Sequence, residues 1–131
     1  MKRREARVAC MQILYNADFT NSSIKESAKA VADDGVIAPE VEVFLQLVED
    51  NLEKIDAIIE KSLTNYSINR LNMVDKAIIR LATAELLDGK TPKNIVINEA
   101  LEITKEYSDQ GDHKATSFNN RLLDQISKNL E

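Results

Sequence analysis

Residues 74–86 read VDKAIIRLATAEL, and this stretch decides the fold class. Its apolar side chains recur at intervals of three and four residues, which is the period of an α-helix. They are Val74, Ala77, Ile78, Leu81, Ala82 and Leu86. Asn72 precedes the stretch as a capping side chain, and Gly89 followed by Pro92 ends it. The sequence therefore predicts a strongly periodic helix that stops at Gly89.

Comparable apolar stripes extend outward from this helix toward both ends of the chain. The other predicted helices cover about residues 3–18, 23–35, 39–63, 96–107 and 116 onward. The third of these is long for one globular helix, so we expect a kink near Asn51, whose side chain would cap a new helix. No alternating strand pattern occurs. The chain is thus predicted to be all-α, with about seven helices in two small antiparallel bundles, roughly residues 1–50 and 51–131, of one domain that covers residues 1–131.

The composition fits a compact helical domain. The chain has 131 residues, of which 44% are hydrophobic, and it has only 3 Gly and 2 Pro. Cys10 is the only cysteine, which excludes an intramolecular disulfide and a cysteine-rich zinc site. Such sparse cysteine use is typical of the reducing cytoplasm. We expect a cytoplasmic protein, because neither a signal peptide nor an apolar run of about 20 residues is present.

The residues that catalysis needs are sparse. His113 is the only histidine, and it lies beside Asp112 in a predicted polar loop, where we expect an exposed side chain. Cys10 lies on the apolar stripe of the first helix and is expected to be a small buried residue. Glu85 and Glu99 are expected to be surface charges. We therefore predict no enzyme, no metal site and no bound cofactor.

Charge is distributed unevenly along the chain. The net charge is −5, yet residues 1–17 hold four cations, Lys2, Arg3, Arg4 and Arg7, against Glu5 alone, which is a net +3. Guanidinium groups on one helix face bind phosphate well, so this patch is a candidate nucleic-acid contact. A solvated helix face gives the same pattern. The residues alone leave both interpretations open.

Two further features have a double interpretation. Tyr15 lies beyond the basic patch, where its ring would stack on an unpaired base or pack into the core, and periodicity favours the core. Lys76 and Arg80 form another basic pair at the i,i+4 spacing, and Arg70 precedes them. The sequence does not say whether these cations join the first patch.

Four blocks of the sequence, which follow one another in order over nearly the whole chain, resemble a known family. They are RREAR at 3–7 with MQILY at 11–15, NR at 69–70 with VDKAIIRLA at 74–82 and EL at 85–86, Pro92 with IVINEALEI at 95–103, and Phe118, Asn120 and LLD at 122–124. Together they resemble the NusB family of bacterial transcription antitermination factors. The resemblance implies an all-helical fold of two antiparallel bundles and a non-enzymatic adaptor.

The resemblance also implies partners. Members of this family pair with NusE, which is also a small-subunit ribosomal protein, and the pair binds the single-stranded boxA element of nascent RNA. With RNA polymerase and other Nus factors the complex suppresses termination at ribosomal RNA operons. A homodimer is a further state that the resemblance admits.

Site residues follow from the resemblance in the same way. The resemblance maps Lys2, Arg3, Arg4 and Arg7 onto RNA contacts and matches Tyr15 to a position associated with RNA, and we expect Lys76 and Lys114 to add to them. The residues that it assigns to a protein partner are Tyr15, Asp75 and Asp112. The loop over 112–117 matches a family loop that modulates RNA affinity.

The chain also departs from the family pattern. The last block usually reads Lys-Phe-Val-Asn-Gly, whereas residues 117–121 here read SFNNR. Ser117 thus lacks a cation, Arg121 replaces a glycine, and Tyr66 stands where tryptophan is common. Two alternatives therefore stay open. One is a helical interaction adaptor that does not bind RNA, and the other is the RNA-targeting module of an RNA methyltransferase, which requires an additional methyl-donor domain.

Overall fold

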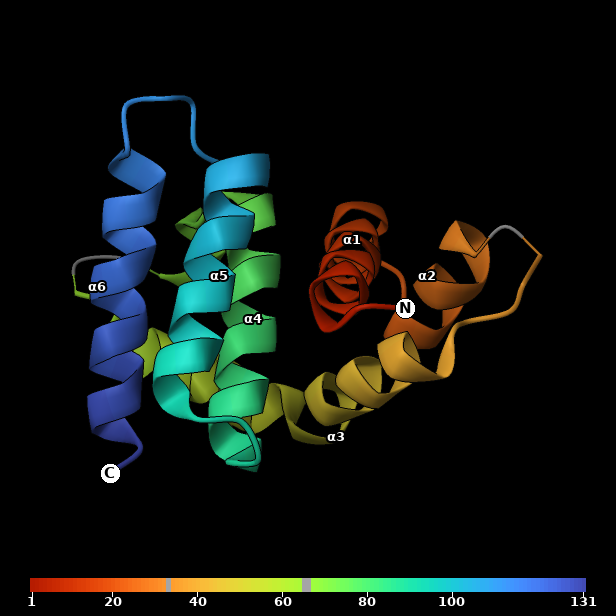
Figure 1. The fold of residues 1–131 in the computed structure, drawn as a ribbon, viewed down its shortest axis with the longest axis horizontal. Coiled ribbons are helices and arrows are strands. Elements are labelled where there is room, and N and C mark those ends of the chain that lie inside the picture. The colour runs from red at the N-terminus through yellow and green to blue at the C-terminus, as the bar shows by residue number, and fades with distance from the viewer. Residues whose placement is uncertain (33, 65–66) are drawn as a thin grey trace.

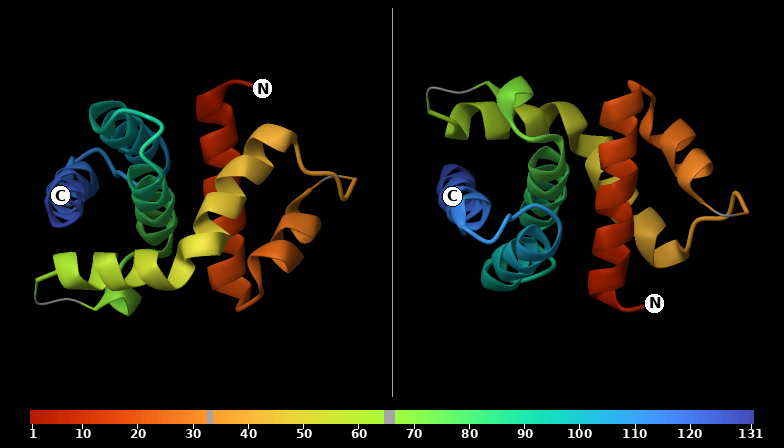
Figure 2. Two further views of the ribbon diagram at one scale, coloured as in Figure 1. Left: turned by 90° about the horizontal axis from the view of Figure 1, so that it is seen from below. Right: turned by 90° about the horizontal axis from the view of Figure 1, so that it is seen from above.

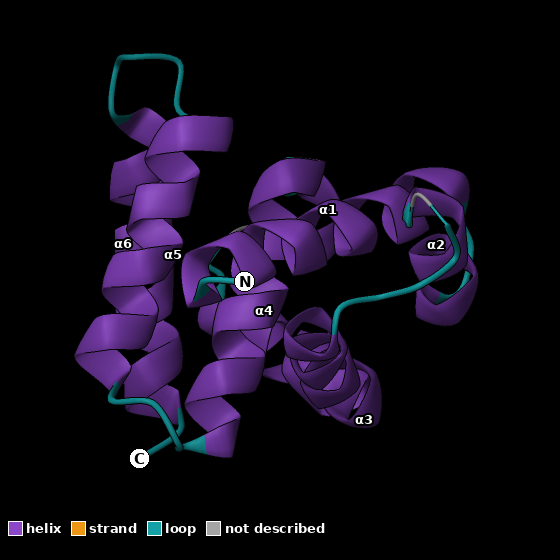
Figure 3. Cartoon of the chain, turned by 45° about the vertical axis from the view of Figure 1, so that its right-hand side comes forward, coloured by secondary structure: helices purple, strands orange, loops and turns teal. Residues whose placement is uncertain are grey.

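The computed structural model describes residues 1–32, 34–64 and 67–131, and every regular element in these ranges is helical (Figure 3). The elements are α1 (Arg3–Thr20), α2 (Ile24–Val31), α3 (Pro39–Ser62), the short 3-10 helix η1 (Ile68–Arg70), α4 (Met73–Asp88), α5 (Lys93–Tyr107) and α6 (Lys114–Asn129). The all-α prediction is confirmed. In this part of the chain, no helix is long and apolar enough to cross a membrane.

The helices form two groups that meet along α1 and α4. Helices α4, α5 and α6 stand side by side and run up and down in alternation (Figure 1). Helix α1 is seen end-on in that view and side-on in Figure 2, so it crosses α4 instead of following it. Helix α2 packs on α1, and α3 begins beside them and continues behind α4 and α6 (Figure 1). The second half of α3 thus joins the two groups.

Helix α3 has the predicted kink at Asn51, whose backbone leaves the helical region with φ −127° and ψ 16°. Counting the two segments of α3 separately gives the expected seven helices. The predicted cap is different, however. The Asn51 side-chain amide donates to the Leu47 carbonyl at 3.0 Å, so it satisfies the end of the first segment instead of opening the second.

Helix α4 is the centre of the fold, as its periodicity predicts. It contacts α1, α3, α5 and α6, and its core residues Ile79 and Ala82 are buried. Three charged residues of this helix, Asp75, Lys76 and Glu85, are buried as well. Buried charges require partners, and those partners decide which cations remain available to a ligand.

The loop between α5 and α6 ends earlier than predicted, because α6 begins at Lys114 and not near Thr116. The Asp109 carboxylate accepts hydrogen bonds from the amides of Gly111, His113 and Thr116 at 2.8, 3.1 and 3.3 Å. His113 adopts a left-handed backbone with φ 61°. Asp109 therefore acts as a remote cap that orders the loop and the first turn of α6.

Candidate nucleic-acid interface

The arginine cluster, defined here as Arg3, Arg4 and Arg7 of α1, is held by two carboxylates from other helices. Arg7 Nε and Nη2 each donate to Glu85 of α4 at 2.8 Å, and both side chains are nearly buried, at 4% and 5% exposure. The hydrogen bond to Glu85 raises the pKa of Arg7. Arg7 is therefore a structural ion-pair partner, not the exposed phosphate contact that the sequence predicts.

Arg3 and Arg4 differ from Arg7 in exposure. Arg4 pairs through Nε and Nη2 with both carboxylate oxygens of Glu99 on α5, and about half of the Arg4 side chain is exposed. Arg3 lies 5.1 Å over the Phe44 ring as a cation–π contact and is mostly exposed. Hydrogen bonding from Arg4 lowers the pKa of Glu99, which is therefore ionised at neutral pH.

The predicted roles of the acidic residues change accordingly. Glu85 is buried and Glu99 is only 17% exposed on its side chain, so the prediction of two surface charges is wrong for Glu85. Arg7 Nη1 also reaches Glu99 at 3.4 Å. The two carboxylates thus bind α1 to α4 and α5.

The basic pair on α4 does not extend the arginine cluster. The Lys76 ammonium is buried and lies 2.9 Å from a carboxylate oxygen of Asp18 on α1. The two groups form an ion pair, but their relative orientation is not that of a hydrogen bond. Arg80 makes a bidentate contact to Asp56 of α3 at 2.9 and 2.8 Å. These cations clamp neighbouring helices to α4, so Lys76 is not available to RNA in this conformation.

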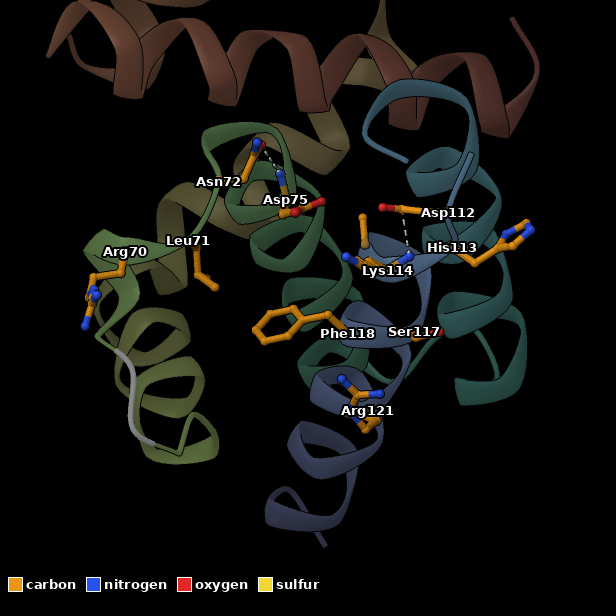
Figure 4. Close-up of a pocket in the computed structure, with 11 residues that line it drawn as sticks. Arg70, Leu71, Asn72, Asp75, Asp112, His113, Lys114, Ser117, Phe118 and Arg121 are labelled. Atoms are coloured by element: carbon orange, nitrogen blue, oxygen red, sulfur yellow. Dashed lines mark hydrogen bonds between the residues drawn. The ribbon is translucent and has the colours of Figure 1, made fainter. Parts of the chain in front are cut away.

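A separate open cavity of about 650 Å³ lies between the start of α4 and the start of α6 (Figure 4). Three cations line it, Arg70 from η1 and Lys114 and Arg121 from α6. Phe118 reaches from α6 toward Leu71 across the interior (Figure 4). Lys114 and Arg121 are exposed, and among the described residues neither makes an ion pair. An aromatic ring beside exposed cations such as Lys114 and Arg121 is one arrangement that binds single-stranded nucleic acid.

A buried polar network reaches this cavity at Asp75. Asp75 accepts from the Ser108 hydroxyl at 2.6 Å and from the Asn119 side-chain amide at 3.1 Å. Asn119 also donates to the Thr104 hydroxyl at 3.1 Å. Asp75 is only 9% exposed, so its main visible role is to hold the α5–α6 loop and α6 against α4. It presents little surface to the protein partner that the sequence predicts for it.

The remaining predicted site residues lie on the surface or close to it. Asp112 is exposed and accepts from the Lys114 amide at 3.1 Å. Lys2 is exposed ahead of α1. Tyr15 is half-buried against the core and stacks on Phe19, with ring centroids 6.0 Å apart. Phe19 is 65% exposed, and the sequence interpretation missed it although its i,i+4 spacing from Tyr15 was a usable signal.

The arginine cluster and the cavity are two surfaces, not one patch. Arg7 meets Glu85 near the end of α4, whereas Asp18 meets Lys76 near its beginning, where Asn72 and Asp75 line the cavity. The two surfaces therefore lie toward opposite ends of α4. A ligand that touches both must be extended.

Other candidate groups have the expected surroundings. His113 is exposed and points away from the cavity interior (Figure 4). Cys10 is fully buried, and burial raises the pKa of its thiol. Among the described residues no cluster of three or more His, Cys, Asp or Glu could hold a metal ion. Tyr66 lies outside the described residues.

Comparison with known proteins places these features in a family. The NusB family model matches residues 4–128. Transcription antitermination protein NusB of Bacillus subtilis (strain 168) is 34% identical over 132 residues, which cover 100% of this chain and 98% of that protein. The structure of T. maritima NusB matches with a TM-score of 0.84 and 32% identity, over 98% of this chain and 92% of that one. A crystal structure of antitermination factors NusB and NusE in complex with dsRNA contains a chain that matches with a TM-score of 0.82 and 29% identity, over 97% and 96% of the two chains. With its family model matched over nearly the full length, the chain belongs to the NusB family.

Proposed function

We propose that this chain is a transcription antitermination factor that binds boxA-type single-stranded RNA together with NusE. The observation that carries the proposal is the open cavity, where Lys114 and Arg121 are exposed beside the Phe118 ring. The names of the relatives support it, since one matching structure holds NusB, NusE and RNA in one complex. In the cytoplasm the complex would act on RNA polymerase with other Nus factors at ribosomal RNA operons.

The RNA-contacting residues in this proposal are a revised set. Lys2, Arg3, Arg4 and Lys114 remain, because each has an exposed or half-exposed side chain. We add the cavity residues Arg70, Phe118 and Arg121. A base stacked on Phe118 would be held between cations that bind its flanking phosphates, which gives an aromatic contact of about 1–3 kcal/mol. Arg7 and Lys76 support this surface from within.

We assign the NusE contact to the exposed aromatic face of α1. Phe19 is 65% exposed and its ring stacks on Tyr15, which gives a rigid apolar surface of the kind that anchors protein partners. Asp112, on the exposed α5–α6 loop, adds a charge beside the RNA cavity. A partner that contacts both α1 and Asp112 would border the RNA cavity, so NusE and RNA would bind side by side.

The test is a titration of boxA-type RNA and of a scrambled RNA of the same length, with the chain alone and with purified NusE. We expect NusE to tighten boxA binding at least about tenfold and to leave the scrambled RNA nearly unchanged, because joint binding adds contacts that one partner lacks. Equal affinity with and without NusE contradicts the proposal. Sedimentation of the free chain in the same buffer shows whether a homodimer competes with NusE.

A helical adaptor that does not bind RNA is the second candidate. The observation in its favour is that Arg7 and Lys76 are engaged in internal ion pairs on a chain of net charge −5. It predicts that NusE binds, while neither RNA shows a salt-sensitive affinity. The same titration therefore separates the two candidates.

A further inference from the structure

The arginine cluster is less positive in the folded chain than in the sequence. The three arginines of the cluster carry +3, but Glu85 and Glu99 lie against them and reduce the net charge of the group to +1. Each carboxylate comes from a helix about 80 to 95 positions away in the sequence, so no count along the chain reveals it. A phosphate that approaches α1 meets the exposed Arg3 and Arg4 together with the partly exposed carboxylate of Glu99.

Glu99 occupies the part of Arg4 that a phosphate needs. A guanidinium binds phosphate through a pair of parallel N–H donors, and Arg4 already directs Nε and Nη2 to the two oxygens of Glu99. Arg7 Nη1 also contacts this carboxylate from the buried side, at 3.4 Å. Phosphate must therefore displace Glu99 or bind next to its negative charge.

We infer that Glu99 is a specificity-determining residue. It competes with RNA phosphates for Arg4 and so lowers the affinity for RNA that binds through the arginine cluster alone. The inference rests on the proposed function for its RNA ligand. RNA of arbitrary sequence binds through phosphate contacts, so competition from Glu99 lowers its affinity in full. RNA that binds in the cavity also gains affinity from Phe118 and Lys114. Glu99 lowers the affinity of such RNA only to the extent that it also contacts Arg4.

A purely structural ion pair between α1 and α5 makes a different prediction. Loss of such a pair lowers the melting temperature and leaves RNA affinity unchanged. Competition predicts instead a higher affinity and a steeper dependence on salt, because an unpaired Arg4 releases its own counterions when RNA binds. RNA affinity is thus a readout that a structural role alone does not move.

The experiment compares Glu99→Gln with Glu26→Gln, using scrambled and boxA-type single-stranded RNAs of one length. Both variants raise the net charge by one, but Glu26 is exposed on α2, which packs near the other end of α1 (Figure 2). We expect Glu99→Gln to tighten scrambled RNA about fivefold, to steepen its salt slope by about one, and to tighten boxA RNA by a smaller factor. No difference between the two variants on scrambled RNA overturns the inference.

Two additions keep the outcome clear. Arg4→Gln in the Glu99→Gln background should return scrambled-RNA affinity to the wild-type value. Failure to do so assigns the effect to another cation and overturns the inference.

The NMR signal of Arg4 Nε–H in the wild-type chain should move at saturation with scrambled RNA. An unmoved signal means that the contact between Arg4 and Glu99 survives binding, which contradicts the competition. If boxA and scrambled RNA bind alike to the wild-type chain with NusE, the proposed function fails, yet the comparison on scrambled RNA still decides the role of Glu99.

Discussion

The arginine cluster and the cavity between α4 and α6 are both cationic, but they use their cations in opposite ways. In the cluster Arg7 is buried, and its guanidinium is fully committed to Glu85 and Glu99. In the cavity Lys114 and Arg121 are exposed, and no described carboxylate pairs with them. The first arrangement holds helices together, and the second leaves charge for a ligand. An exposed cation that no described carboxylate pairs with keeps its full charge for a ligand.

The largest expected effect comes from removing one member of the buried pair. Arg7→Ala leaves the Glu85 carboxylate in an apolar setting without its two 2.8 Å donors, so the free energy of unfolding should fall by about 3–5 kcal/mol. Urea denaturation followed by circular dichroism measures this change. Arg121→Ala is the matched control on the cavity side, where the loss should stay within about 0.5 kcal/mol.

A second variant separates charge from packing at the same place. Replacing both partners, as Arg7→Met with Glu85→Leu, removes the unpaired charge and should recover most of the stability lost in Arg7→Ala. If Arg7→Ala costs no more than Arg121→Ala, the two regions do not differ in the way described, and the ion pair adds nothing to the fold.

The two regions also differ in how well their properties can be predicted from the sequence. The helices and the kink at Asn51 were predictable, because apolar spacing and helix-end chemistry are local. The availability of a cation is not local. Arg7 and Glu85 are 78 positions apart, and only the crossing of α1 over α4 brings them together. The i,i+4 spacing of Arg3 and Arg7 therefore suggested one basic face where the structure has an exposed and a buried arginine.

One signal for this burial was present in the sequence. Arg7 precedes Cys10 by three positions and Met11 by four, so helical geometry places it on the apolar stripe that becomes the core. Glu85 follows Leu81 by four positions and lies on the buried face of α4 in the same way. An oppositely charged residue on each of two apolar stripes predicts a buried pair, although only the fold tells which helices meet.

A smaller effect, on binding alone, is expected at the cavity. Arg121→Ala should weaken boxA-type RNA about fivefold and reduce the salt slope by about one, because one phosphate contact is lost. Lys128→Ala is the matched control, since Lys128 is an exposed cation at the far end of the same helix, where it pairs with Asp124 of its own helix at 3.2 Å. Fluorescence anisotropy at several salt concentrations measures both. Equal losses in the two variants would mean that RNA senses only overall charge.

The smallest expected effect concerns the hydrogen bonds that order the α5–α6 loop at the edge of the cavity. Asp109 accepts from the Thr116 hydroxyl at 2.7 Å and from the Gly111, His113 and Thr116 amides, and these bonds lower its pKa to about 2. The ordinary value in an unfolded chain is about 3.9. Because folding lowers this pKa, the stabilisation of the α5–α6 loop is complete above about pH 4 and is lost as the pH falls through about 2.

Amide hydrogen exchange at Gly111 and His113 should therefore accelerate between these two pH values by more than its intrinsic pH dependence. Asp109→Asn should show the faster exchange already at pH 6. Asp112→Asn should change little, because among the described residues Asp112 accepts from a single amide, that of Lys114. A midpoint for Asp109 near 4 in a carboxyl NMR titration would show that these bonds do not order the loop, and Lys114 and Phe118 would then need a ligand to be positioned.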